Sequence, residues 1–139
     1  MEKQINKEDM EQDNYNTPEY IRNIFRNWFD PCEISTGELR SFDGLGSSWK
    51  DNTFVNPPYS KLDPWVLKAI EENKKGKTIV LLLKCDPSTK VYRYLYEAKA
   101  HILFFNERVA FNGKKPMFPS MLCILAKSEE VQARHSSQA

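Results

Sequence analysis

The pattern of hydrophobic and polar residues divides the chain into a polar N-terminal arm, one folded segment and a polar C-terminal tail. Residues 1–14 are almost wholly polar, and so are residues 128–139. Segments of this kind bury too little apolar surface to fold, so we expect a flexible arm and a polar tail. Between them, residues 15–127 form a single predicted domain.

Four segments of this domain have the composition of β-strands. The clearest is 78–83, a continuous hydrophobic run that is typical of a strand covered on both faces. The other three lie at residues 53–55, 101–105 and 120–126. A weaker signal at residues 29–33 predicts the end of a short strand and its exit turn.

Three segments have helical periodicity. The first begins with Thr17 as N-cap and Pro18 at the first helical position, and it ends before Pro31. The other two lie at residues 64–73 and 90–99. Strands that alternate with helices, followed by two strands in succession, predict an α/β sheet that is mainly parallel with an antiparallel C-terminal hairpin.

Composition is that of an ordinary globular protein, but the charges are unevenly distributed. The 139 residues are 40% hydrophobic and 28% charged, with a net charge of +1. Residues 1–60 hold 6 basic and 11 acidic side chains, whereas residues 61–115 hold 12 basic and 6 acidic ones. A basic segment attracts polyanions, although lysines on a solvated face give the same pattern.

Cysteine and histidine usage predicts neither a disulfide framework nor a metal site. The three cysteines are Cys32, Cys85 and Cys123, and none is within metal-binding spacing of another or of a histidine. Free thiols fit a reducing cytoplasm. The start of the chain is too polar for a signal peptide, and no apolar run approaches the roughly 20 residues of a membrane helix. We therefore expect a cytoplasmic protein without a membrane segment.

The tetrapeptide Asn56-Pro57-Pro58-Tyr59 is the most informative motif, because it directly follows a predicted strand. Ligands of open α/β sheets bind at the carboxyl ends of strands, which is where this motif falls. The alternative is a rigid turn, since Asn-Pro commonly begins turns.

With this motif the chain resembles the small phage-type, Dam-like DNA N6-adenine methyltransferases. The matching residues occur in order over about residues 15–125. They include Thr17-Pro18, Asp30-Pro31-Cys32, Asp43-Gly44-Leu45, Asn56-Pro57-Pro58-Tyr59 and Arg108. The resemblance implies a reduced Rossmann-like sheet that uses S-adenosylmethionine to methylate the N6 amino group of adenine.

The resemblance also implies roles for the motif residues. The side-chain oxygen of Asn56 and the backbone carbonyl of Pro57 accept the two N–H bonds of the target amine, which favours its reactive pyramidal form. Tyr59 stacks on the base after it flips out of the duplex, and Pro58 fixes the turn. For Tyr59, an ordinary core position is the alternative.

The cofactor site is assigned only by the resemblance, because the chain has no glycine-rich first turn. Thr17 and Pro18 are expected at the methionine end of S-adenosylmethionine, and Asp43 near its adenosine. Asp30 and Cys32 are expected in the family's variant of the first cofactor turn, with Asn56 beside the donor. The aspartates also suit ordinary turns.

Double-stranded DNA is the expected partner, and its contacts are assigned to the basic part of the chain. The candidates are Lys61, Arg108, Lys114 and Lys115, whose contacts to phosphates would position the duplex. There is no room for a separate recognition domain, so bases must be read by short loops or by a second subunit of a homodimer.

Two other functions remain open from the sequence. The motif also serves methylation of cytosine N4, or of amino groups in RNA or protein. The missing glycine-rich turn instead favours a catalytically inactive, nucleic-acid-binding or structural relative.

Overall fold

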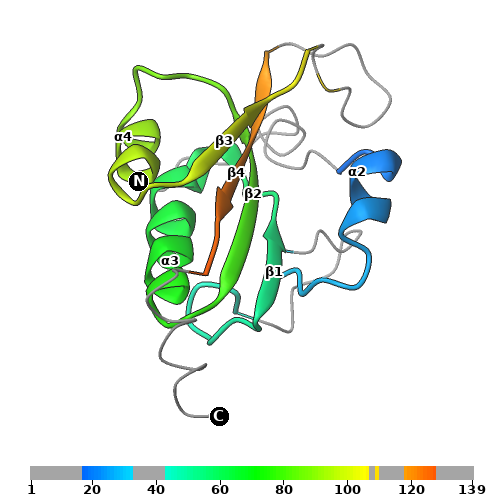
Figure 1. Ribbon diagram of the computed structural model, residues 1–139, viewed down its shortest axis with the longest axis vertical. Coiled ribbons are helices and arrows are strands. Elements are labelled where there is room, and N and C mark those ends of the chain that lie inside the picture. The colour runs from blue at the N-terminus through cyan, green and yellow to red at the C-terminus, as the bar shows by residue number, and fades with distance from the viewer. Residues whose placement is uncertain (1–16, 33–42, 107–108, 110–117, 128–139) are drawn as a thin grey trace, which may run out of the picture.

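The computed structural model describes residues 17–32, 43–106, 109 and 118–127, so the predicted arm and tail lie outside the described residues. Within these ranges one sheet of four strands forms the centre of the fold (Figure 1). Each strand falls on a segment that the sequence predicted as a strand. They are β1 (Asn52–Val55), β2 (Thr78–Lys84), β3 (His101–Phe104) and β4 (Ser120–Leu125).

The sheet is mixed, with the strand order β1-β2-β4-β3. β1 and β2 pair in parallel, whereas β4 is antiparallel to both of its neighbours, β2 and β3. The expectation of a mainly parallel sheet is therefore wrong for the described strands, since most of their pairing is antiparallel. The predicted antiparallel pairing of the final two strands is confirmed.

Burial explains why β4 lies inside the sheet and β3 at its edge. Met121, Cys123 and Leu125 of β4 are almost fully buried, whereas Leu103 and Phe104 of β3 are more than half exposed. The apolar strand takes the interior position and runs back between β2 and β3. Consequently β1, β2 and β3 run in one direction. The residues that follow β1 and β2 therefore lie at the same end of the sheet, the carboxyl end of these strands.

Helices cover the sheet on both faces (Figure 1). Helices α3 (Leu62–Lys74) and α4 (Lys90–Glu97) lie on one face, and the short helix α2 (Glu19–Ile24) lies on the other. Alternate side chains of β2 enter the two cores, so that Leu81 packs in the core beneath α3 and α4 and Leu82 packs in the core that includes Ile21 of α2. This two-sided burial confirms the prediction made from the hydrophobic run.

The first helix is shorter than its sequence pattern predicts and has a different N-cap. Pro18 occupies the cap position with an extended backbone, and no side chain caps the helix. The helix ends at Ile24 because the next aromatic residue turns toward the sheet, where the ring of Phe25 stacks on Phe54 at 4.6 Å between centroids. Beyond it, the weak strand signal corresponds to a single parallel bridge between Phe29 and Thr53.

Candidate active site

The Asn-Pro-Pro-Tyr motif leaves the sheet at the carboxyl end of β1. Asn56 is 8% exposed and Pro57 is buried, while Pro58 and Tyr59 are half-buried. Pro58 has an extended backbone, and the short 3-10 helix η1 (Tyr59–Lys61) begins directly after it. The two prolines keep the chain extended for two residues beyond the strand, since proline disfavours helical backbone in the residue before it. The motif therefore presents its polar groups at the carboxyl end of β1.

Asn56 is in contact with the segment that precedes α2. Its side-chain Nδ2 donates a hydrogen bond of 3.1 Å to Oγ1 of Thr17. The sequence predicted Thr17 as a helix cap, but its hydroxyl interacts with Asn56 instead. The fold therefore joins two of the predicted site residues, one from the N-terminal segment and one from the motif.

Tyr59 packs against an aromatic residue that the sequence analysis missed. The rings of Tyr59 and Phe118 meet edge to face, with their centroids 5.0 Å apart. Nζ of Lys84, the last residue of β2, lies 5.6 Å from the centroid of the Phe118 ring. The only signal for Lys84 and Phe118 was their position next to predicted strands, because the contacts of Phe118 with Tyr59 and with Lys84 depend on the strand order.

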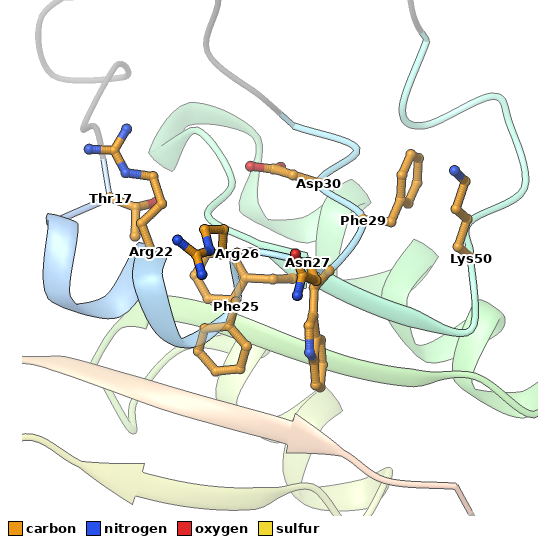
Figure 2. Close-up of a pocket in the computed structure, with 10 residues that line it drawn as sticks. Thr17, Arg22, Phe25, Arg26, Asn27, Phe29, Asp30 and Lys50 are labelled. Carbon is orange, nitrogen blue, oxygen red and sulfur yellow. The ribbon is translucent and has the colours of Figure 1, made fainter.

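A cleft of about 560 Å³ lies beside α2 and contains two of the predicted cofactor residues (Figure 2). Thr17 and Asp30 both line it, and its walls include four aromatic rings. Three basic side chains that the sequence analysis did not select also line it. The rings belong to Phe25, Trp28, Phe29 and Phe54, and the basic residues are Arg22, Arg26 and Lys50.

Asp30 and Asp43 each stabilise a turn. Oδ1 of Asp30 accepts a hydrogen bond from the backbone N–H of Cys32, and Oδ1 of Asp43 accepts from the N–H groups of Leu45 and Gly46. The two turns lie side by side, since a Cβ atom on Gly44 would come within 2.2 Å of the carbonyl oxygen of Pro31. Each aspartate therefore has the turn-forming geometry that was the alternative to a cofactor contact.

The remaining cofactor candidates differ in their surroundings. Cys32 is 3% exposed and packs in the core with Trp49 and Trp65, so its side chain lies away from the cleft surface. Asp43 is exposed and Pro18 is half-buried. Neither of them lines the cleft.

Of the predicted DNA-binding residues, only Lys61 lies within the described part of the chain. It is exposed at the end of η1, two residues after Tyr59. Arg108, Lys114 and Lys115 lie outside the described residues. A further charged group follows β2, where hydrogen bonds from the hydroxyl and backbone N–H of Ser88 lower the pKa of Asp86.

The described residues contain no group of histidine, cysteine and acidic side chains that could hold a metal ion. All three cysteines are free thiols. Burial, together with the neighbouring Cys85, raises the pKa of the Cys123 thiol to about 12, so this thiol stays protonated at neutral pH. In the same part of the chain, each helix is too short or too polar to span a membrane.

Comparison with known proteins supports the resemblance seen in the sequence. A family model described as DNA N-6-adenine-methyltransferase (Dam) matches residues 4–137. The chain is also 37% identical over 70 residues to the DNA N-6-adenine-methyltransferase of Haemophilus phage HP1 (strain HP1c1). That alignment covers 48% of this chain and 40% of the phage protein, so the chain matches less than half of that relative's length. No solved structure matches the chain significantly.

Proposed function

We propose that this chain, which belongs to the DNA N-6-adenine-methyltransferase (Dam) family, transfers a methyl group from S-adenosylmethionine to N6 of adenine in DNA. The observation that best supports this function is the contact between Asn56 and Thr17. It brings the carboxyl-end motif to the segment that lines the aromatic cleft. An amine-binding motif and a space for the methyl donor are therefore adjacent.

The side chains that line the cleft match the chemical groups of S-adenosylmethionine. Its aromatic walls can hold an adenine ring, and its basic and acidic side chains can hold a carboxylate and an ammonium group. Of the predicted cofactor residues, Thr17 and Asp30 line the cleft itself. Pro18, Cys32 and Asp43 remain predicted cofactor residues that do not line the cleft.

The motif residues would prepare the amine for attack. Its two N–H bonds donate to Oδ1 of Asn56 and to the carbonyl of Pro57, which concentrates the nitrogen lone pair on the side facing the donor. S-adenosylmethionine, held in the cleft lined by Thr17 and Asp30, would supply the methyl group on its sulfonium and keep the sulfur's electron pair as the thioether product, and the extra proton on N6 would leave to water. Tyr59 offers its ring to the flipped base, and the prolines hold these groups in register.

DNA would approach the end of the sheet where β1 and β2 finish and where the motif lies. Lys61 is exposed beside Tyr59, and Lys84 is exposed at the end of β2. Both can contact phosphates near a base that has left the duplex. Arg108, Lys114 and Lys115 remain predicted DNA contacts, the cytoplasm remains the expected compartment, and short loops or a second subunit of a homodimer remain the two alternatives for reading bases.

A catalytically inactive relative is the second candidate, because a specific observation favours it. The predicted first cofactor turn lacks glycines. Asp30 in this turn and Asp43 in the adjacent turn each accept a hydrogen bond from the backbone of their own turn. Calorimetry with S-adenosylmethionine separates the two functions, because an inactive relative that has lost the cofactor site gives no heat of binding.

Transfer of a tritiated methyl group to adenine-containing duplex DNA tests the proposed activity. We expect label in the DNA and, after digestion, on adenine. Label on cytosine would instead assign the chain to cytosine-N4 methylation. An absence of label from a chain that binds both cofactor and DNA would contradict the proposal.

Replacement of Asn56 by alanine should lower turnover by about 100-fold or more, because it removes an acceptor needed chiefly in the transition state. Cofactor affinity should survive. Asn56→Asp should keep part of the activity, since a carboxylate also accepts hydrogen bonds. Full activity of Asn56→Ala in the tritium assay would refute the role of this residue.

A further inference from the structure

We infer that Thr17 is a positioning residue that orients the side-chain amide of Asn56 for catalysis. This inference rests on the proposed function and adds a residue to its mechanism. The two side chains are 39 positions apart in sequence and are joined by a hydrogen bond of 3.1 Å from Nδ2 of Asn56 to Oγ1 of Thr17. The contact is therefore made by the fold and not by local chain geometry.

The orientation of this amide decides whether it can activate an amine. One end of an asparagine amide is an acceptor and the other is a donor. Rotation about the last side-chain torsion exchanges the two ends, and this torsion has only broad preferences of its own. If Nδ2 faced the target amine, two donors would oppose each other. With Nδ2 held at Thr17, Oδ1 lies on the other side of the amide, where it can accept the N6 hydrogen.

The Thr17 hydroxyl both donates and accepts, so it stabilises this orientation by accepting from Nδ2 while Oδ1 faces the amine, and it is well placed to do so because its neighbour is anchored. The carbonyl of Pro18 accepts hydrogen bonds from the N–H groups of Ile21 and Arg22, at 3.1 and 2.9 Å. Ile21 is 1% exposed in the core on that face of the sheet. The backbone beside Thr17 is therefore fixed to the sheet through the start of α2. Asn56 is itself 8% exposed, and a hydrogen bond in such surroundings is stronger than one in water.

Thr17 also lines the cleft, so a direct contact with the cofactor is the competing role for this residue. The two roles differ in what they change. A cofactor contact alters the affinity for S-adenosylmethionine, and saturating cofactor then restores the rate. Orientation of Asn56 alters turnover at saturation and leaves cofactor affinity nearly unchanged.

The first measurement compares Thr17→Val, which has nearly the same shape without a hydroxyl, with Thr17→Ser, which keeps the hydroxyl. We expect Thr17→Val to lower kcat by about tenfold, the factor that corresponds to loss of one hydrogen bond. Its dissociation constant for S-adenosylmethionine, measured by calorimetry, should stay within about twofold of the unmodified chain. Thr17→Ser should keep most of the activity. Thr78→Val, at the amino end of β2, is the matched control and should change neither quantity.

The second measurement repeats Thr17→Val in an Asn56→Asp background. A carboxylate has an acceptor at both ends, so it does not need to be oriented. Thr17→Val should therefore lower kcat by less than about threefold in that background, against about tenfold in the Asn56 chain. A merely structural role for Thr17 would cost the same factor in both backgrounds.

Three results would overturn the inference: an unchanged kcat in Thr17→Val, a loss confined to cofactor affinity, or equal losses in the two backgrounds. Thermal melting checks that each variant is folded, and Thr17→Ala replaces Thr17→Val if the valine variant melts early. With any of these results, inactivity of Asn56→Ala would leave the proposed function standing. A lack of methyl transfer by the unmodified chain would overturn both.

Discussion

Gly44 lies against the backbone of Pro31, and a larger residue does not fit between the two turns. A Cβ atom there would come within 2.2 Å of the Pro31 carbonyl oxygen and 2.5 Å of the Trp65 ring. The first neighbour is backbone and the second belongs to a buried ring, so neither can move at low cost. Gly44→Ala should therefore lower the free energy of unfolding by about 1–3 kcal/mol, measured by urea denaturation.

Gly46→Ala is the matched control for this prediction. A Cβ atom at Gly46 meets mainly the carboxylate of Asp43, the far end of an exposed side chain, which can move at the cost of two exposed hydrogen bonds that water can replace. We expect Gly46→Ala to cost clearly less than Gly44→Ala. Equal costs would mean that the two turns do not lie against each other as described.

Glu72 is a fully buried carboxylate surrounded by lysines. It forms ion pairs with Lys68 at 2.9 Å, with Lys75 at 3.8 Å and with Lys77. Burial alone would raise the pKa of Glu72, but hydrogen bonds and charges from Lys77 and Lys68 lower it from its ordinary value of 4.5 to about 2. These contacts join the end of α3 to the turn that leads into β2.

The lowered pKa of Glu72 predicts how stability depends on pH. The unfolded chain binds a proton near pH 4.5 and the folded chain only near pH 2. The stabilisation is therefore fully present above pH 4.5 and is lost as the pH falls toward 2. Urea unfolding between pH 6 and about pH 2 should show a falling free energy of unfolding. In Glu72→Gln, the part of this fall that comes from protonation of Glu72 should be absent.

Glu71 provides the control for the pH measurement. It is on the same helix but 63% exposed, and among the described residues it pairs with Lys75 alone, at 3.6 Å. Glu71→Gln should leave the dependence on pH nearly unchanged, because exposed ion pairs contribute little. If Glu72→Gln left the curve unaltered as well, the buried ion pairs would not be the source of the acid sensitivity.

At the scale of elements, the positions of β3 and β4 can be tested with one type of substitution. Leu125 of β4 is 1% exposed, whereas Leu103 of the edge strand β3 is 54% exposed. Leu125→Ala should lower the free energy of unfolding by about 2–5 kcal/mol, and Leu103→Ala by less than about 1 kcal/mol. Urea denaturation of the two variants gives both values. Similar costs for the two would contradict the order β1-β2-β4-β3.

Element types could be predicted from the sequence much better than their arrangement. The run from Ile79 to Leu83 indicated a central strand because both of its faces are apolar, and the structure confirms it. The place of β4 between β2 and β3 could not be predicted, because the composition of a buried strand does not tell which strands are its neighbours. The length of α2 was overestimated because Phe25 and Trp28 continue its apolar pattern but pack from the turn that follows it.

At the scale of the whole molecule, the motif could be predicted and its surroundings could not. Asn56 and Tyr59 were selected because a rare tetrapeptide followed a strand. Phe118 reaches Tyr59, and Lys84 reaches Phe118, only because β4 starts where β1 and β2 end, and this depends on the strand order. The basic side chains of the cleft, such as Arg22 and Arg26, had the pattern of an ordinary polar helix face. Site residues brought together by long-range packing leave little local signal in a sequence.

Methylation of adenine N6 by this chain can be measured by mass spectrometry of DNA from a host that lacks its own adenine methylation. Genomic DNA offers every sequence context, so the recognition sequence need not be known. The host should contain N6-methyladenine when it expresses this chain, and at least about 100-fold less when it expresses Asn56→Ala at the same level. N6-methyladenine that is unaffected by Asn56→Ala, or methyl groups found on cytosine N4 instead, would contradict the account.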